Sequence, residues 1–166
     1  PVYCVDDDKA KGIGAAKGTS PKNVLTSTIG DELKLYSQGK AIVYSIAPTR
    51  DAAVLSAGHA ADGAIWLDDE SGEWCSTAYY GKELPKWAKE YNRLYPAAKE
   101  IANKAWTPDN YFTGSFTYFM GSSAQTTFSH KFNSDRRYRE YKASALVNDN
   151  VTKTACPLYT TDAAEE

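Results

Sequence analysis

The chain has 166 residues, of which 42% are hydrophobic and 24% are charged. These proportions are typical of a folded globular protein and exclude a disordered chain. Nineteen Lys and Arg residues against 21 Asp and Glu residues give a net charge of -2, so nothing attracts the whole chain to a nucleic-acid polymer. A long uncharged stretch, which includes residues 111–129, is interrupted by Gly, Ser, Thr and Gln, which argues against a membrane span.

The first nineteen residues have the composition of a loop. They contain the acidic run Asp6–Asp8 and a glycine-rich stretch over residues 12–18, among small residues and lysines. Such composition indicates turns rather than a helix or a strand. We therefore expect a mobile, loop-rich lead-in over residues 1–19 with a solvated acidic run, followed by a single α/β domain over residues 20–166.

The next segment has the signature of a helix. Ser20 is a typical N-cap, and Pro21 suits the first helical position. Apolar residues then recur at near-helical spacing over residues 24–35, and Gly39 supplies a stop signal. The pattern predicts a helix over residues 20–38.

Strand and helix patterns alternate after this helix. Residues 40–46 form a short apolar run rich in β-branched side chains, which is typical of a buried strand, and residues 50–61 are small enough for a helix. Residues 63–69 and 73–80 read as two aromatic-bearing strands around a turn that contains Gly72. The alternation predicts an α/β or α+β fold with a β-hairpin in this region.

A proline divides the next helical pattern. Residues 85–104 show helical spacing of apolar side chains, and Pro96 removes a backbone donor inside it. We expect the break at Tyr95. From residue 106 to residue 162 no period is sustained, so we predict irregular structure with a few short helices or strands.

Histidine chemistry offers little by itself. His59 and His130 are the only histidines, and neither belongs to a pattern that places two zinc ligands on one helix face. Ser56 precedes His59 by three residues, so an independent Ser/His hydrolase is one hypothesis, although the nucleophile-elbow pattern is missing. The simpler interpretation is a tight turn at a helix end with His59 packed beneath it.

Aromatic residues are unusually frequent, with twelve Tyr and four Trp. Planar rings fill cores, and they also stack on sugars and bases, so composition alone favours neither role. One functional hypothesis is therefore a non-catalytic module that holds a glycan or a nucleotide on an aromatic surface that includes Tyr111, Phe112, Tyr118 and Phe119. Exposure of the rings would distinguish a binding surface from a core.

Four segments carry a resemblance to a known family. They are S-P-K-N-V-L at residues 20–25, T-I-G-D-E-L at 28–33, A-G-H-A-A-D-G-A at 57–64 and W-L-D-D-E-S-G-E-W at 66–74. In this order and at these distances, they resemble the alkaline phosphatase superfamily. More narrowly, they are similar to bacterial type I phosphodiesterase/nucleotide pyrophosphatase and phosphate-irrepressible alkaline phosphatase proteins. The match is strongest over residues 20–92.

The resemblance implies an internal segment of a phosphoric ester hydrolase. The segment would combine part of an alkaline-phosphatase-like three-layer core with an accessory or cap region over residues 93–166. In this superfamily the nucleophile and the ligands of two zinc ions lie in motifs that this sequence lacks. The resemblance thus implies zinc in the parent enzyme, no catalytic residue or metal ligand in this segment, and no activity in isolation.

The same resemblance implies partners and a location. The partners are a phosphate ester substrate and the remaining parts of the parent catalytic core. The parent is expected to be periplasmic or otherwise exported, as members of this family commonly are.

The resemblance also points to a substrate-binding segment. In the phosphomonoesterase branch, a Lys and, two residues later, an Arg bind the transferred phosphoryl group. Counted back from His59, these positions are Thr49 and Asp51, which cannot clamp a dianionic monoester. A phosphodiester is therefore favoured, while a one-residue shift that brings in Arg50 keeps monoesters open. We expect Thr49, Arg50 and Asp51 to bind substrate at the end of the predicted strand.

Overall fold

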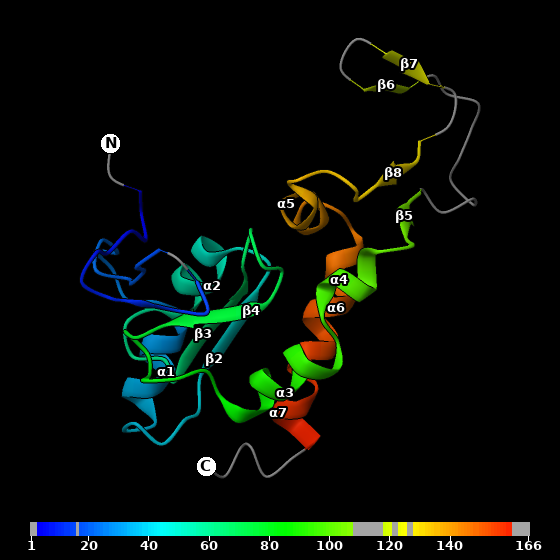
Figure 1. Cartoon of the computed structure of the whole chain (residues 1–166). Helices are drawn as coiled ribbons and strands as arrows, with labels where there is room; N and C mark the ends of the chain where they lie inside the picture. Colours follow the sequence, from blue (N-terminus) through cyan, green and yellow to red (C-terminus); the bar gives the residue numbers. More distant parts are fainter. Residues whose placement is uncertain (1–2, 16, 108–117, 121–122, 126–127, 161–166) are drawn as a thin grey trace.

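A mixed four-stranded sheet lies at the centre of the fold (Figure 1). The computed structural model describes five stretches of the chain, residues 3–15, 17–107, 118–120, 123–125 and 128–160. The strand order is β1-β4-β3-β2, with β1 at Gly12–Ile13, β2 at Tyr44–Ala47, β3 at Gly63–Leu67 and β4 at Trp74–Thr77. Strands β2 and β3 are parallel and are connected through helix α2 (Arg50–Ala57), whereas β4 is antiparallel to both of its neighbours.

The second half of the described chain adds helices and short ribbons beside the sheet (Figure 1). The helices are α3 (Lys86–Leu94), α4 (Ala97–Ile101), α5 (Arg137–Lys142), α6 (Leu146–Ala155) and α7 (Pro157–Thr160). The antiparallel ribbons pair β5 (Ala105–Trp106) with β8 (His130–Lys131), and β6 (Tyr118–Met120) with β7 (Ser123–Gln125).

Strand β3 is buried on both faces, and its side chains divide the core in two. Ala64 and Trp66 join a cluster that contains the buried residues of α2. Ile65 and Leu67 point to the other face, where they join a larger cluster built from α3, α4, α5 and α6. This division follows from the alternation of side chains along a strand. The layers of helix, sheet and helix confirm the α/β expectation.

The helix predicted over residues 20–38 is wrong in its first half. Helix α1 spans only Ile29–Tyr36. Its N-cap is Thr28, whose side chain accepts from the Asp31 N–H while the Asp31 carboxylate accepts from the Thr28 N–H, a complete capping box. The Ser20 hydroxyl, expected to cap the helix, instead donates to Asp7 at 2.6 Å.

The lead-in is more ordered than its composition predicts. Val5 is fully buried, and strand β1 pairs with β4. Asp7 is also buried, and Ser20 and Lys22 donate hydrogen bonds to its carboxylate. The expectation of a solvated acidic run is therefore wrong for this residue. The division of the chain at residue 19 stays a prediction.

Other elements lie close to their predicted places. The hairpin is confirmed, and α3 and α4 are separated at Tyr95 and Pro96 as expected. The helix predicted over residues 50–61 ends at Ala57, because Gly58 adopts a φ of 74° that terminates α2. The strand predicted over residues 40–46 begins only at Tyr44. In the region predicted to be irregular, α6 is a helix of 10 residues.

Candidate functional site

The predicted substrate-binding residues line one hollow of 640 Å³. Thr49 follows β2 and is the N-cap of α2, and Arg50 and Asp51 form the first turn of that helix. The hollow is also lined by residues 68–70, which follow β3. Because β2 and β3 are parallel, their carboxyl ends meet at one edge of the sheet, the usual place for a ligand in an α/β fold. The substrate-binding role of the three residues stays a prediction.

Arg50 is held by the N-terminal segment. Its Nη1 lies 2.6 Å from Asp6 Oδ1 and 3.4 Å from Thr19 Oγ1. The guanidinium also stacks over the Tyr3 ring, 4.7 Å from the ring centre. The charge of Arg50 is thus already neutralised by a carboxylate of this chain, which argues against its use as the main phosphate clamp.

Asp51 is anionic at neutral pH. Burial raises the pKa of its carboxyl, but hydrogen bonds from Thr49, from the backbone N–H groups of Asp51 and Ala52 and from Tyr3 outweigh this, so the pKa lies below its ordinary value. The helix N-terminus adds to this preference for a negative charge. The hollow therefore presents a carboxylate where a phosphomonoesterase would present a cation.

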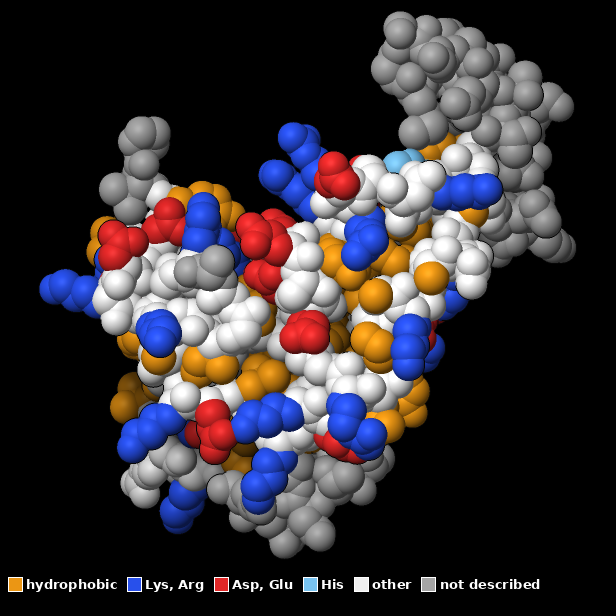
Figure 2. All heavy atoms as spheres, in the orientation of Figure 1, with side chains coloured by type: hydrophobic (Ala, Val, Ile, Leu, Met, Phe, Trp, Pro, Cys, Tyr) orange, Lys and Arg blue, Asp and Glu red, His pale blue; other side chains and the backbone are white. Residues whose placement is uncertain are grey.

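Helix α5 supplies basic side chains on the other side of the hollow. Lys142 Nζ donates to the carbonyl oxygen of Leu67 at 2.8 Å and forms an ion pair with Asp69. Arg139, one turn earlier, also lines the hollow and has no hydrogen bond or ion pair to its side chain within the described residues. Figure 2 shows basic side chains over α5 and acidic side chains over the neighbouring β3–β4 turn. Sequence reasoning placed neither basic residue at this site, although their spacing of three on one helix was a signal.

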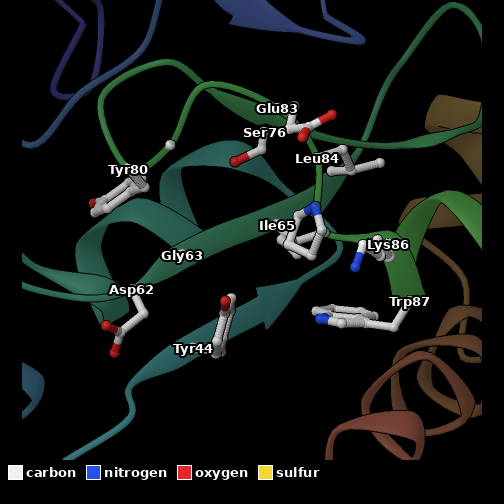
Figure 3. Close-up of a pocket in the computed structure, with 12 residues that line it drawn as sticks. Tyr44, Asp62, Gly63, Ile65, Ser76, Tyr80, Glu83, Leu84, Lys86 and Trp87 are labelled. Carbon is white, nitrogen blue, oxygen red and sulfur yellow. The ribbon is translucent and has the colours of Figure 1, made fainter. Parts of the chain in front are cut away.

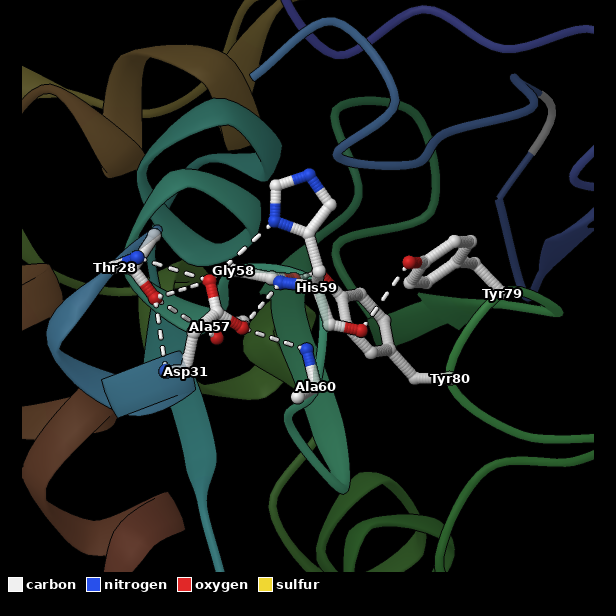
Figure 4. A network of polar contacts seen from close by, with 8 residues as sticks. All are labelled: Thr28, Asp31, Ala57, Gly58, His59, Ala60, Tyr79 and Tyr80. Carbon is white, nitrogen blue, oxygen red and sulfur yellow. Dashed lines mark hydrogen bonds and ion pairs between the residues drawn. The ribbon is translucent and has the colours of Figure 1, made fainter. Parts of the chain in front are cut away.

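Asp31 joins the start of α1 to the turn after α2 (Figure 4). Its Oδ1 accepts from the backbone N–H groups of His59 and Ala60, each at 2.7 Å, and its Oδ2 accepts from the Thr28 N–H at 2.9 Å. His59 Nδ1 lies 3.4 Å from Oδ2. Burial raises the pKa of Asp31, but these bonds outweigh it and lower the pKa to about 2. The network is a structural clamp between two segments.

The tight turn predicted at His59 is confirmed, but the side chain is not packed beneath it. The His59 side chain is 39% exposed. The His59 ring lies against Asp31, and the Tyr79 hydroxyl donates to the His59 backbone carbonyl. Within the described residues, no hydrogen bond joins His59 to Ser56. The structure therefore does not assemble the Ser/His pair.

A smaller hollow of 310 Å³ lies at the opposite ends of the strands (Figure 3). Tyr44 and Trp87 meet edge to face there, with ring centres 6.0 Å apart. Its two carboxylates already have partners, because Asp62 pairs with a lysine of α1 and Glu83 pairs with a lysine of α3. This hollow is separate from the predicted substrate site.

The described aromatic rings mainly build the core. Trp66, Trp74, Tyr91 and Tyr141 are all buried. Of the residues named for a binding surface, Tyr111 and Phe112 lie outside the described residues, as do the side chains of Tyr118 and Phe119. What is described therefore favours core filling over an aromatic platform.

A zinc site does not fit the described residues. Nowhere in the described stretches do three or more His, Cys, Asp or Glu side chains gather as metal ligands would. His130 has Glu140 as its carboxylate partner at 3.2 Å, and His59 has Asp31. None of the helices that the structure describes combines the length and hydropathy needed to cross a bilayer.

Comparison with known proteins identifies alkaline phosphatases. Alkaline phosphatase PafA of Elizabethkingia meningoseptica is 32% identical over 140 residues, 76% of this chain and 26% of that protein. Alkaline phosphatase PhoV of Synechococcus elongatus is 35% identical over 111 residues, 65% of this chain and 19% of that protein. A protein of Myroides odoratus named calcium-transporting ATPase is 42% identical over 95 residues, 55% of this chain and 17% of that protein. No family model matches the chain.

The fold of the chain is also similar to solved structures of an alkaline phosphatase. The crystal structure of wild-type alkaline phosphatase PafA matches 98% of this chain and 33% of that chain with a TM-score of 0.65 and 27% identity. A PafA variant with four substitutions gives a TM-score of 0.66. The chain spans about a sixth to a quarter of the length of these curated relatives. Two of these three relatives and both structures are alkaline phosphatases, and they support the chain's membership of the alkaline phosphatase superfamily.

Proposed function

We propose that this chain is the substrate-side segment of a metal-dependent phosphoric ester hydrolase and that its site prefers phosphodiesters to phosphomonoesters. The similarity to alkaline phosphatases supports the hydrolase class. The observation that supports this preference is the ionised carboxylate of Asp51, which lines the hollow at the carboxyl edge of the sheet. This preference agrees with the type I phosphodiesterase/nucleotide pyrophosphatase branch.

Charge decides between the two kinds of ester. A phosphomonoester loses its second proton at about pH 6, so it is a dianion at pH 8, whereas a phosphodiester carries one negative charge. A second negative charge about 5 Å from the Asp51 carboxylate costs on the order of 3 kcal/mol at an effective dielectric constant of about 20. Thr49 contributes a hydroxyl and no charge, and its one hydrogen is donated to the Asp51 carboxylate in this structure.

In this proposal other parts of the parent protein supply the nucleophile and the ligands of two zinc ions. The described residues offer no such ligand group. Helix α1 also presents an apolar stripe to solvent, with Ile29 and Tyr36 each 90% exposed and Leu33 49% exposed. We propose that the remaining catalytic core covers this stripe, and that the parent is exported, which cell fractionation would test.

Calorimetry on the purified chain tests the preference. Diphenyl phosphate is expected to bind more tightly than phenyl phosphate at pH 8. Lowering the pH to 5 should strengthen phenyl phosphate binding, because the ligand gains a proton while Asp51, whose pKa lies below its ordinary value, stays ionised. Tighter binding of the monoester at pH 8 would contradict the proposal.

A matched pair of variants isolates Asp51. Asp51→Asn should raise the affinity for phenyl phosphate about tenfold at pH 8, since it removes roughly 1.4 kcal/mol or more of repulsion. Glu32→Gln removes a charge from the exposed first turn of α1 and should leave the affinity unchanged. Hydrolysis of either ester by the chain with added zinc would refute the prediction of inactivity in isolation.

A further inference from the structure

Of the two arginines that line the hollow, one has no side-chain partner within the described residues. Arg50 is paired with Asp6, and Lys142, whose side chain is only 8% exposed, is engaged by Asp69 and the Leu67 carbonyl. Within the described residues, the Arg139 guanidinium has neither a hydrogen bond nor an ion pair. It is the one guanidinium of the hollow that is free to meet a ligand.

Building on the proposed function, we infer that Arg139 binds the phosphodiester group and sets the substrate specificity of this site. The cation that the alkaline phosphatase resemblance requires, and that Thr49 and Asp51 fail to provide, thus comes from the accessory region. Nothing in the local sequence around residues 49–51 indicates this contribution.

The geometry of α5 holds Arg139 at the hollow. Lys142, one turn along the helix, ties α5 to the last residue of β3 through the Leu67 carbonyl. Tyr138 is buried, and its ring lies directly against Gly72 in the β3–β4 turn. The backbone beneath Arg139 is therefore fixed relative to the strand ends, and only its own side chain needs to order when a ligand binds.

The charges of the hollow match a monoanion. A guanidinium presents parallel N–H donors that pair with the two non-bridging oxygens of a diester. Two of the neighbouring carboxylates are held by other donors, because Asp68 accepts from the Ser71 backbone and hydroxyl, and Asp51 accepts from Thr49 and Tyr3. Glu70 also lines the hollow. These carboxylates still repel a second negative charge, so Arg139 would anchor a diester rather than a dianion.

Lys17 is the other cation on the rim. It lines the hollow and has no ion pair within the described residues. Its ammonium is a point charge on a flexible stem and lacks the paired donors of a guanidinium. Lys17→Gln therefore separates general attraction of an anion from recognition of the diester by Arg139.

The test is calorimetry with diphenyl phosphate on the full chain. Arg139→Gln should weaken binding about tenfold or more, and Arg139→Lys should recover only part of the loss. The matched control is Arg136→Gln, since Arg136 is an exposed arginine of the preceding turn that does not line the hollow. Circular dichroism checks that each variant is folded.

The outcomes separate the inference from the function on which it rests. If Arg139→Gln changes the affinity for diphenyl phosphate by less than about twofold, the role of Arg139 is overturned and the proposed function still stands. Equal losses in Arg139→Gln and Arg136→Gln, or a larger loss in Lys17→Gln, also overturn it, because they indicate non-specific attraction. If the wild-type chain binds neither ester, both proposals fail.

Discussion

Replacing Asp31 with Asn should destabilise the chain while changing its shape very little. The Asp31 carboxylate uses both oxygens, with Oδ1 accepting from His59 and Ala60 and Oδ2 accepting from Thr28. An amide keeps one acceptor oxygen, so its NH₂ group faces either the Thr28 N–H or the two N–H groups of the turn. At least one partly buried N–H is then left without an acceptor.

The magnitude follows from these bonds. An N–H left unpaired costs about 1–3 kcal/mol, and loss of an N-terminal cap costs about 0.5–2 kcal/mol. The two overlap here, because the Thr28 N–H belongs to the cap, so we expect a loss of about 2 kcal/mol. In a domain of this size, that lowers Tm by about 4–8 °C. Thermal unfolding followed by circular dichroism measures the change.

Glu32→Gln is the matched control. It removes the same charge from the same helical turn, but the Glu32 side chain is exposed and has no hydrogen bond or ion pair within the described residues. Only its interaction with the helix dipole is lost, about 0.5 kcal/mol. If Asp31→Asn costs no more than Glu32→Gln, the carboxylate is not the clamp that its geometry indicates.

The contribution of Asp31 to the free energy of unfolding also depends on pH. Its folded pKa is lowered to about 2, whereas an Asp in an unfolded chain titrates near 3.9. A lowered folded pKa stabilises the protein above the unfolded pKa, and this stabilisation is lost as the pH falls toward the folded value. The gap in unfolding free energy between wild type and Asp31→Asn should be full at pH 6 and shrink between about pH 4 and pH 2. A gap that stays constant would refute the assignment.

Two further predictions concern packing. Gly72→Ala should lower the unfolding free energy by about 2–4 kcal/mol, because Gly72 has a φ of 70° and a Cβ there would collide with the Tyr138 ring. The control Gly81→Ala makes only an ordinary contact at 3.7 Å, so its unfolding free energy should change by no more than about 0.5 kcal/mol. Burial raises the pKa of the Cys75 thiol and shields it from reagents. Ellman's reagent should therefore react with the two exposed cysteines of the native chain and with Cys75 only in denaturant. Fast reaction of all three cysteines would show that the core around β4 opens.

The sequence predicted the elements whose signals are local. The hairpin turn needs a residue with positive φ, and Gly72 supplies it. The break between α3 and α4 follows from the missing N–H of Pro96, and α2 ends where Gly58 adopts a positive φ. In each case one residue type decides the backbone geometry within a few positions, so no tertiary information is required.

The start of α1 could not be predicted in this way. Ser20 and Pro21 form a genuine helix-start pattern, yet the Ser20 hydroxyl donates to Asp7, thirteen positions earlier in the chain. Thr28 and Asp31 offered a second capping pattern that the helix actually uses. Two local signals competed, and a long-range hydrogen bond decided between them.

The candidate site shows the same limit. Its location at the end of β2 could be predicted, because ligands in α/β folds lie at the carboxyl ends of parallel strands. The arrangement of charges in the site could not be predicted. Arg50 forms an ion pair with Asp6 of the lead-in, and Arg139, far along the chain, lines the same hollow. Both features depend on contacts between segments that share no local sequence pattern.

The exposed face of α1 explains why Asp31 matters to this chain. An isolated helix of 8 residues is unstable in water, and α1 buries only Gly30. Ile29 and Leu35, which belong to the apolar period of the sequence, lie in solvent and contribute little to stability here. The bonds of Asp31 to Thr28 and to the turn at His59 must therefore do what burial does for other helices. Covering the stripe with a larger catalytic core would add burial, so Asp31→Asn should destabilise the parent protein less than it destabilises this chain.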